Sequence, residues 1–401
     1  MESYVDVCSD TFLQNGLRSR FPAPDAASFG PNRKNRSRNR KGVYPIMKKV
    51  LAVVLALVLT LSLVGMAVAE GKVGVAMPTQ SLQRWNQDGE NMKAQLEAAG
   101  YEVDLQFANN EVATQVSQLE NMILNGAQIL VVASIDGSAL GTVLATAKDA
   151  GIPIIAYDRL LTDTEAVDYY TTFNNYKVGQ IQGQYVVDRF DLSNEAVTGP
   201  FTIEFTAGDP GDNNAGLFFS GAVDTLQPYL DSGKLVCLSG QLDFNSVATP
   251  DWDSATAQAR MDNILSGYYA DALTGGTTLD ICLCSNDSTA LGVTNSLVAA
   301  GYTAENIPVI TGQDCDIANT KNMVKGLQAM SVFKDTRILA AQTVAMVSDI
   351  LAGKTPETTS TYANGLMDVP TYECTPLFAD ASNYQELLID SGYYTEEQLA
   401  D

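Results

Sequence analysis

The stretch EVATQVSQLENMILNGAQILVVAS, residues 111–134, decides the fold because it joins a helical pattern to a buried-strand pattern. Val112, Val116, Leu119 and Ile123 are spaced by four, three and four residues, which places them on one face of a helix. Residues 128–134 then form a short apolar run that is typical of a buried strand. A helix that leads directly into such a strand indicates a βαβ unit with a parallel sheet.

The same alternation continues on both sides of this stretch. Glycine follows the helical segments as a stop signal in LEAAGYEV, AKDAGIPI and LVAAGYTAENIPV. Four of the predicted strands precede about residue 170 and four follow about residue 200, so we predict an α/β fold with two similar doubly wound parallel-sheet lobes. The predicted strands are 72–77, 102–107, 128–134, 152–157, 201–207, 234–240, 279–285 and 307–312.

An export signal is predicted at residues 47–69, MKKVLAVVLALVLTLSLVGMAVA. Its basic start, its apolar run over 50–64 and its small residues Ala67 and Ala69 follow the order of a secretory signal peptide. The apolar run is shorter than the roughly 20 residues that span a bilayer, and no cysteine follows it to carry a lipid. We therefore predict cleavage near Ala69 and an exported protein, in the periplasm or on the outer face of the cytoplasmic membrane.

Residues 1–46 differ in composition and include the basic stretch PNRKNRSRNRKG at 31–42. One interpretation is a basic arm that contacts nucleic acid or membrane. The other is an extension upstream of the true start at Met47. We favour the second, because export signals lie close to the N-terminus of a chain.

The composition excludes several classes of function. The chain carries 24 Lys and Arg against 47 Asp and Glu, a formal net charge of −23, which disfavours binding to nucleic acid. It contains no histidine, so hydrolases with a Ser-His-Asp triad and zinc sites with imidazole ligands are not expected. The five cysteines after residue 70 are expected to be buried free thiols, since a domain of this size needs no disulfide.

Polar side chains follow five of the predicted strands. Ligands of doubly wound folds bind beyond the carboxyl ends of the strands. Carboxylates, amides and guanidinium groups can each hold adjacent hydroxyls, and an indole can cover the apolar side of a sugar ring, so we predict a pocket for a small polyol. The strand-end residues are Arg84, Trp85, Asp158, Arg159, Asp212, Asn213, Asn214, Asn286, Asp287, Gln313 and Asp314.

Each of these residues also has a structural interpretation. Asp287 precedes a periodic apolar stretch and could be a helix N-cap, and residues 212–214 could form a turn and a cap. Arg159 could form an ion pair on a loop, and Trp85 could pack in the core. Their occurrence at five separate strand ends favours a binding site.

Neither a cofactor nor a metal is expected. The glycines at 208, 211 and 216 do not have the G-x-G-x-x-G spacing of a dinucleotide site, and no Walker sequence follows them. The residues at 212–216 also lack the third ligand of a calcium-binding loop.

Nine motifs from about Lys72 to the C-terminus resemble a known family. In order, they are RW, NMILNGAQILVVASIDGSAL, GIPIIAYDR, GDPGDNNA, LQPYLDSGKL, ATAQARMDN, SNDSTALG, GQDCD and VFKDTR. Together they resemble the xylose-binding and multiple-sugar-binding periplasmic proteins of ABC importers. The resemblance implies a type I periplasmic binding protein fold, in which two Rossmann-like lobes joined by a three-segment hinge close on a sugar.

Matching motif by motif, the resemblance assigns ligand contacts to both lobes. It implies a first lobe of 70–172 plus 333–365 and a second lobe of 173–332 plus 366–401. Asn263 and Lys334 rest on the resemblance alone. The implied ligand-binding residues are Arg84, Trp85, Asp158, Arg159, Asp212, Asn214, Asn263, Asp287, Gln313, Asp314 and Lys334.

The sequence departs from the family pattern at FNN, 173–175, where relatives often have an aspartate, and at Cys315, where a small residue is usual. Both positions lie near the implied hinge or pocket. The sequence therefore leaves the identity of the sugar open among xylose, glucose, galactose and similar aldoses.

The implied function is capture of a monosaccharide and its delivery to the membrane subunits of an ABC permease, by a monomer without enzymatic activity. A sensor role toward a chemoreceptor or sensor kinase remains an alternative, because it would use the same closed surface. A glycosidase would need a carboxylic acid with a raised pKa, whereas each candidate Asp has an amide or Arg beside it. A sugar-responsive repressor would need a helix-turn-helix before Lys72, where the export signal lies.

Overall fold

The computed structural model describes residues 71–400. The predicted N-terminal extension (1–46) and the signal peptide (47–69), with its cleavage site near Ala69, lie outside these residues. Within the described part of the chain, no helix combines the length and the apolar character that crossing a bilayer requires.

The first lobe is built on a seven-stranded sheet in the order β11-β12-β5-β4-β3-β1-β2. Neighbouring strands are parallel except for β11 and β12. The stretch at 111–134 folds as predicted into helix α3 (Val112–Leu124) and strand β3. The strands are β1 (Lys72–Met77), β2 (Glu102–Phe107), β3 (Ile129–Val132), β4 (Ile154–Tyr157), β5 (Tyr169–Phe173), β11 (Ser360–Ala363) and β12 (Asp368–Cys374).

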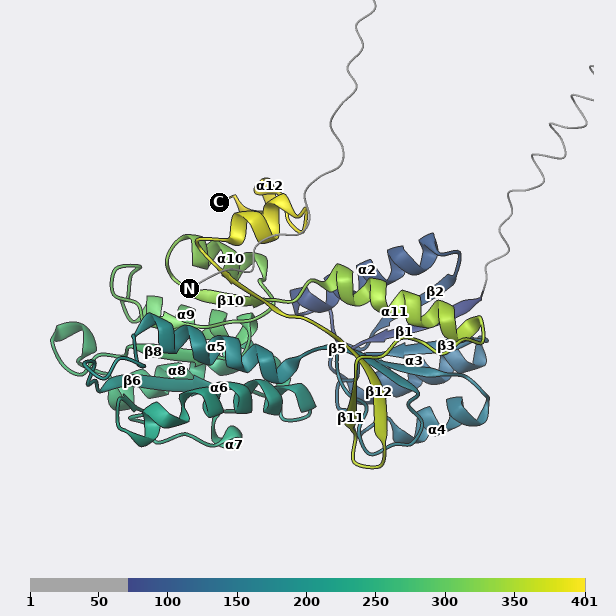
Figure 1. Ribbon diagram of the computed structural model, residues 1–401, viewed down its shortest axis with the longest axis horizontal. Helices are drawn as coiled ribbons and strands as arrows, with labels where there is room; N and C mark the ends of the chain where they lie inside the picture. The colour runs from purple at the N-terminus through teal and green to yellow at the C-terminus, as the bar shows by residue number, and fades with distance from the viewer. Residues whose placement is uncertain (1–70, 401) are drawn as a thin grey trace, which may run out of the picture. The chain divides into compact units, whose positions relative to one another are not determined.

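Helices cover both faces of this sheet. Helices α2 (Gln83–Ala98) and α11 (Thr336–Leu351) pack on one face, and α3 and α4 (Gly141–Asp149) pack on the other (Figure 1). Leu119 of α3 is fully buried, but Val112, Val116 and Ile123 are only partly buried.

The most buried face of α3 differs from the predicted apolar face, because it includes a polar residue. Gln115 is fully buried, and its amide donates to the Ala133 carbonyl at 2.8 Å and accepts from the Ile135 amide at 3.0 Å. A glutamine can be buried there because it satisfies the backbone just beyond the end of β3.

The second lobe contains a parallel sheet in the order β7-β6-β8-β9. Strands β10 and β13 pair antiparallel, and a parallel bridge from Gln313 to Val332 links β10 to the segment after β9. The strands are β6 (Phe201–Thr206), β7 (Leu235–Val236), β8 (Ile281–Cys284), β9 (Val309–Ile310), β10 (Met330–Phe333) and β13 (Leu377–Asp380).

The helices of the second lobe also cover two faces. Helices α5 and α6 lie on one face and α8 and α9 on the other (Figure 1). Gly179 of α5 and Gly221 of α6 allow the close approach of these helices, because an added Cβ at either would lie within 2.1 Å of a backbone oxygen of the other helix. The remaining elements are α5 (Asn175–Arg189), α6 (Asn213–Asp231), α7 (Phe244–Val247), η1 (Pro250–Trp252), α8 (Ser254–Tyr268), η2 (Ala272–Thr274), α9 (Asp287–Ala299), α10 (Ile317–Val324), η3 (Gln385–Asp390) and α12 (Glu396–Leu399).

The chain passes between the two sheets three times, at 173–175, at 333–336 and at 374–377. The last passage differs from the prediction, which assigned 366–401 to the second lobe. Strand β12 pairs with β5, so residues up to Cys374 belong to the first sheet, and only then does the chain return to the second (Figure 1).

The strands absent from the prediction are β5, β10, β11, β12 and β13. They are mostly short, and β12 carries a proline that lies opposite the edge strand β11. Pairing with partners distant in sequence makes such segments into strands, so a local pattern does not reveal them.

The cysteines of the described chain are free thiols, as predicted. Cys282, Cys284, Cys315 and Cys374 are buried, and Cys237 is half-buried. Cys282 and Cys284 lie two residues apart on β8 and join one apolar cluster with α8 and α9.

Candidate functional site

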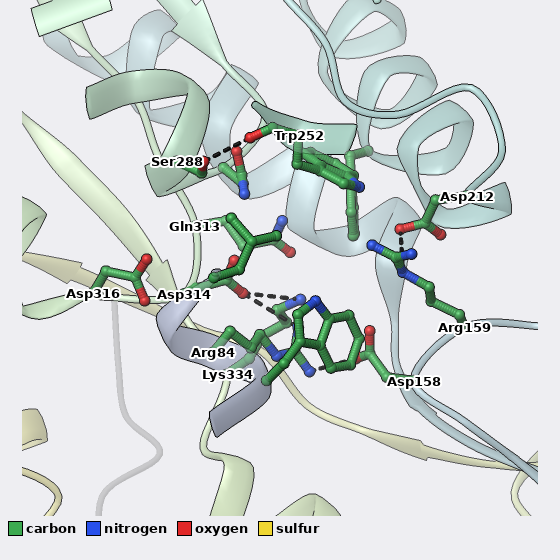
Figure 2. Close-up of a pocket in the computed structure, with 14 residues that line it drawn as sticks. Arg84, Asp158, Arg159, Asp212, Trp252, Ser288, Gln313, Asp314, Asp316 and Lys334 are labelled. Atoms are coloured by element: carbon green, nitrogen blue, oxygen red, sulfur yellow. Dashed lines mark hydrogen bonds and ion pairs between the residues drawn. The ribbon is translucent and has the colours of Figure 1, made fainter. Parts of the chain in front are cut away.

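A polar pocket lies between the two lobes at the ends of their strands (Figure 2). It contains about 410 Å³ of empty space, part of which is open to solvent. Its lining residues are Leu82, Arg84, Trp85, Asp158, Arg159, Asp212, Phe218, Trp252, Asn286, Ser288, Gln313, Asp314, Asp316 and Lys334.

The structure brings eight of the eleven predicted residues to this pocket. Seven of them lie after a strand of a parallel sheet or at the start of the following helix, because successive strands of a doubly wound sheet end at the same edge, and Lys334 follows β10. These residues are Arg84, Trp85, Asp158, Arg159, Asp212, Gln313, Asp314 and Lys334.

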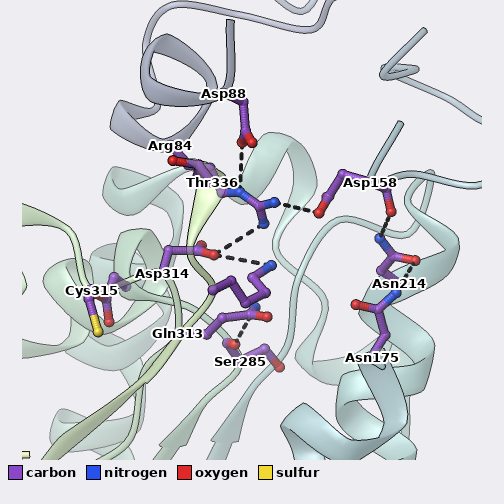
Figure 3. Close-up of polar contacts among 12 residues, drawn as sticks. Arg84, Asp88, Asp158, Asn175, Asn214, Ser285, Gln313, Asp314, Cys315 and Thr336 are labelled. Atoms are coloured by element: carbon purple, nitrogen blue, oxygen red, sulfur yellow. Dashed lines mark hydrogen bonds and ion pairs between the residues drawn. The ribbon is translucent and has the colours of Figure 1, made fainter. Parts of the chain in front are cut away.

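Arg84 is the centre of a buried charge network (Figure 3). Its Nε donates to Asp88 at 2.9 Å, Nη1 donates to Asp314 at 3.3 Å and Nη2 donates to Asp158. Burial alone would lower the pKa of Arg84, but the surrounding carboxylates, above all that of Asp158, raise it well above its ordinary value. Arg84 is therefore a fixed cation, held in position before any ligand arrives.

Within the same network, the pKa values of two carboxyl groups shift in opposite directions. Asp158 has a lowered pKa, because Arg84 and Lys334 outweigh the opposing effect of burial. Asp88 lies deeper, away from the pocket lining, and burial raises its pKa to about 6 despite its contact with Arg84. Asp158 is therefore an ionised hydrogen-bond acceptor at neutral pH. Asp88 accepts a hydrogen bond from Arg84 on the side away from the pocket and so holds the guanidinium group in place.

Ion pairs also cross between the lobes. Arg159 of the first lobe lies 3.0 Å from a carboxylate oxygen of Asp212 in the second, measured from Nε. Arg84 reaches Asp314 across the pocket, and Lys334 lies 3.1 Å from the same carboxylate. With Asp158 and Asp316, the lining carries four carboxyl groups and three cations, a nearly balanced set of charges that suits a neutral ligand.

Aromatic rings line two sides of the pocket. The guanidinium carbons of Arg84 and Arg159 lie 5.4 Å and 5.0 Å from the centre of the Trp85 ring, within the range of cation–π attraction. Trp252 packs edge-on against Phe218 at 6.2 Å. Both tryptophans of the chain therefore reach the pocket.

Several buried polar atoms of the lining have no hydrogen-bond partner within residues 71–400. They are Trp252 Nε1, Gln313 Oε1 and Asp316 Oδ1, together with Arg159 Nε, which is nevertheless ion-paired with Asp212 at 3.0 Å. Burial, together with the charge of Asp314, raises the pKa of Asp316 to about 7. Buried polar groups are normally satisfied, so these atoms indicate where a polar ligand would form hydrogen bonds.

Three predicted residues are not brought to the pocket, and Asp287 is the clearest correction. It is fully buried and accepts hydrogen bonds from Gln328 Nε2 at 2.9 Å, the Ser331 hydroxyl at 3.0 Å and the Asp316 amide at 2.8 Å. Asn286, one residue earlier, caps α9 and lines the pocket instead. The two side chains diverge because successive residues at a helix start point in different directions.

The other two corrections also follow from helix geometry. Asn214 is buried beside the pocket, where its amide donates to the Asp158 carbonyl at 2.7 Å and accepts from Asn175 at 2.9 Å (Figure 3). It therefore holds the backbone that carries Asp158. Asn263 is exposed on α8, opposite the face that buries Met261 and Ile264, and it does not line the pocket.

Six lining residues were not among the predicted ligand contacts. Asn286 was noted at a strand end but not retained, and Asp316 closes the GQDCD motif, so both were within reach. Trp252 follows no strand, but it is one of only two tryptophans in the chain, and this rarity could have marked it as a candidate for the binding site. The residues not selected are Leu82, Phe218, Trp252, Asn286, Ser288 and Asp316.

No group of three or more metal-ligating side chains occurs among the described residues. The nearby carboxylates are engaged by Arg84, Arg159 and Lys334.

A profile of the family described as periplasmic binding protein domain matches residues 73–355, which is more than half of the chain. The chain belongs to this family. The match spans both lobes and all of the pocket-lining residues, so the interlobe pocket occupies the cleft of a periplasmic binding protein.

This periplasmic binding protein has similar relatives along nearly its whole described length. It is 48% identical over 337 residues to the multiple sugar-binding periplasmic receptor ChvE of Rhizobium radiobacter, covering 83% of this chain and 93% of the relative. It is 33% identical to the D-xylose-binding periplasmic protein of Escherichia coli (strain K12), covering 88% of this chain and 100% of the relative.

Solved structures agree with the fold. An ABC transporter solute-binding protein from Clostridium phytofermentans with bound β-D-glucose is 59% identical and has a TM-score of 0.79, over 82% of this chain and 100% of that one. A carbohydrate transporter solute-binding protein from Chloroflexus aurantiacus in complex with D-glucose is 33% identical, with a TM-score of 0.73, over 82% and 98%.

Substitution of Gly208 by alanine tests the position of Trp252 in this periplasmic binding protein. An added Cβ would lie 1.9 Å from the Trp252 ring, so the indole must leave its place in the pocket. We expect Gly208→Ala to weaken ligand binding about tenfold, through loss of ring contact and of the indole N–H. Isothermal titration calorimetry measures the change.

Gly216→Ala is the matched control for this experiment. Gly216 lies within α6, and an added Cβ would meet nothing within 4 Å, so alanine should leave affinity unchanged. Equal affinity of the two variants would show that Trp252 does not contribute to binding.

Proposed function

We propose that the protein is an exported solute-binding protein that holds a monosaccharide between its lobes and delivers it to an ABC permease. The observation that carries this proposal is the composition of the interlobe pocket. Two tryptophans, together with ionised carboxylate and guanidinium groups, come from both lobes, and unpartnered polar atoms of the second lobe complete the lining.

The chemistry of the pocket suits a small neutral polyol. Asp158 is held ionised and can accept from hydroxyl groups, while Arg159 can donate to hydroxyl or ring oxygens. Gln313 and the Trp252 indole offer one unpartnered acceptor and one unpartnered donor. The ring faces of Trp85 and Trp252 would cover the C–H surfaces of a sugar ring.

The names of the relatives support the same class of ligand. Those proteins are described as binding multiple sugars or D-xylose, and two similar solved structures contain glucose. We propose an aldose such as D-glucose, D-xylose or D-galactose for this chain. The proposed ligand contacts are the fourteen lining residues, without Asn214, Asn263 and Asp287.

The proposed mechanism is conformational. The three chain passages between the sheets would act as the hinge, with the first lobe extending to Cys374. A sugar that contacts both lobes stabilises the closed form, because some of its contacts exist only when the lobes meet. Arg84–Asp314 and Arg159–Asp212 would join the lobes in that form.

A binding role fits the site better than a catalytic one. Burial raises the pKa of Asp316 to about 7 and also raises the pKa of Asp212, but Asp158, Asp212 and Asp314 each face a cation. A glycosidase needs a protonated acid and a second carboxylate on opposite sides of the reacting bond. We therefore propose that the sugar is released unchanged. Export by the 47–69 signal, a monomeric state and an additional sensor role stay predictions.

A thermal-shift screen tests the proposed function. The panel contains D-glucose, D-xylose, D-galactose and D-glucuronate, with maltose as a larger ligand that the pocket should exclude. A ligand that binds only the folded protein stabilises it by about 2.7 kcal/mol at one hundred times its dissociation constant, so a specific sugar should raise the melting temperature by several degrees.

The pattern of shifts decides between outcomes. A shift with one or more neutral aldoses but not with maltose supports the proposal. Absence of any shift across the panel would contradict the sugar assignment while leaving the periplasmic binding protein fold in place. Incubation of a shifting sugar with the protein, followed by chromatography, should return that sugar intact.

A further inference from the structure

The C-terminal segment after β13 forms part of the second lobe. Leu388 and Tyr394 are buried in an apolar cluster with Cys315, Phe333 and Ala379. The short helix α12 lies beside α10, where Figure 1 shows it in yellow. This segment should therefore move with the second lobe when the cleft opens.

Two hydroxyls of this segment reach across to the first lobe. That of Tyr393 donates to Gln87 Oε1 at 3.3 Å and lies 3.2 Å from the Thr336 hydroxyl, and the more deeply buried one is that of Tyr394. The Tyr394 side chain is 3% exposed, and its hydroxyl accepts from Gln83 Nε2 at 2.8 Å and from Gln87 Nε2 at 3.0 Å. It donates to the Cys315 carbonyl at 2.9 Å. Gln83 is also bound through its oxygen, which accepts from the Ile317 amide at 3.1 Å.

The residues that Tyr394 joins are direct neighbours of the pocket lining. Gln83 precedes Arg84 and Trp85 in the first turn of α2, and Cys315 lies between Asp314 and Asp316. Tyr394 does not line the pocket. It connects the two segments that bring these four lining residues together from opposite lobes.

We propose that Tyr394 is a positioning residue for ligand binding, and that its bonds to Gln83 and Gln87 favour the closed form of the cleft. The proposal rests on the proposed function, because it assumes that the lobes close on a ligand. The two glutamine bonds join different lobes, so they would form on closure, whereas the bond to Cys315 lies within one lobe and would persist.

The consequence for affinity follows from linkage. Contacts that exist only in the closed form raise its population before the ligand binds, and the apparent affinity rises with that population. Removing the Tyr394 hydroxyl removes two interlobe hydrogen bonds, so we expect about a tenfold loss of affinity. The loss should lie mainly in faster dissociation, because opening releases the ligand.

The experiment compares Tyr394→Phe, Gln87→Leu and the double variant in the purified protein, with D-glucose as the probe. Tyr394→Phe should weaken D-glucose binding about tenfold. Gln87→Leu should also weaken it, because it removes one of the two glutamine bonds of Tyr394 and the bond from the Tyr393 hydroxyl. The loss in the double variant should be smaller than the sum of the two single losses in binding free energy, because both substitutions remove the Tyr394–Gln87 bond. Tyr302→Phe is the matched control, since the buried Tyr302 hydroxyl has no hydrogen-bond partner within residues 71–400 and lies outside the pocket.

A second measurement reports closure without any ligand. The Ile317 amide donates to Gln83 of the other lobe, whereas the Asp316 amide donates to Asp287 of its own lobe. Residue-resolved hydrogen exchange of the free protein should therefore become faster at Ile317 in Tyr394→Phe and stay unchanged at Asp316. A merely structural role of Tyr394 would affect both amides or neither.

The two measurements separate the proposals. If the wild-type protein binds no D-glucose, glucose is not its ligand, and the exchange rates at Ile317 and Asp316 still decide the role of Tyr394. If the wild type binds D-glucose but Tyr394→Phe matches Tyr302→Phe in affinity and in Ile317 exchange, the positioning role is refuted.

Discussion

Substitution of Asp158 by asparagine should weaken sugar binding by about tenfold to a hundredfold while the free protein keeps its fold. Asp158 has a lowered pKa and accepts from Arg84, so it presents an ionised oxygen to the pocket. A hydrogen bond to a charged group contributes about 1.5–3 kcal/mol, which sets the expected range. Asparagine is preferable to alanine because the backbone φ at Asp158 is 58°, a left-handed conformation that asparagine tolerates.

The control for this variant is Asp163→Asn. Asp163 also has a positive φ, 55°, but it is exposed and does not line the pocket. Calorimetric titration with the sugar selected by the thermal-shift screen compares the two. Affinity in Asp158→Asn equal to that in Asp163→Asn would remove Asp158 from the binding site.

Substitution of Asp287 by alanine should have the opposite signature, with a large loss of stability and a small change in affinity. Burial raises the pKa of Asp287 well above its usual value, so its main contribution is hydrogen bonding rather than charge. Alanine would leave the Gln328 amide and the Asp316 backbone N–H without their acceptor. Each unsatisfied buried group costs about 1–3 kcal/mol, so we expect a loss of about 2–5 kcal/mol in the free energy of unfolding.

Thermal unfolding of the ligand-free protein measures this effect as a fall in melting temperature of roughly 5 to 10 °C. Asp287→Asn should lie between the wild type and alanine, because asparagine keeps one acceptor but turns an N–H toward another donor. Asp349→Ala is a surface control, since its ion pair with Lys354 is 3.8 Å long and exposed. A melting temperature of Asp287→Ala within a degree of that control would contradict the structural role.

The contrast between Asp158 and Asp287 shows the limit of what local sequence patterns predict about a binding site. Both aspartates follow predicted strands, and a strand-end rule treats them alike. Asp158 directly follows β4 and projects into the pocket, whereas Asp287 is the first residue of α9 and turns inward toward Gln328 and Ser331. The direction of a side chain at a helix start depends on its phase, which a single sequence does not reveal to within one residue.

The sequence by itself determined the α/β class, the two doubly wound lobes and the edge of the sheets where the ligand pocket lies. Apolar periodicity and glycine punctuation carry this information because they act within a few neighbouring residues. Seven of the eight predicted residues that line the pocket follow from the same rule, since every strand of a parallel sheet ends at one edge, whereas Lys334 was predicted from the family resemblance alone.

Only the tertiary structure decided which residues meet across the two lobes. Strand β12 joins β5 across nearly 200 residues of sequence, Trp252 enters the pocket from a segment that follows no strand, and Tyr394 reaches α2 from the bend before α12. Such contacts depend on the packing of whole lobes, so their partners are far apart in sequence and no local pattern encodes them.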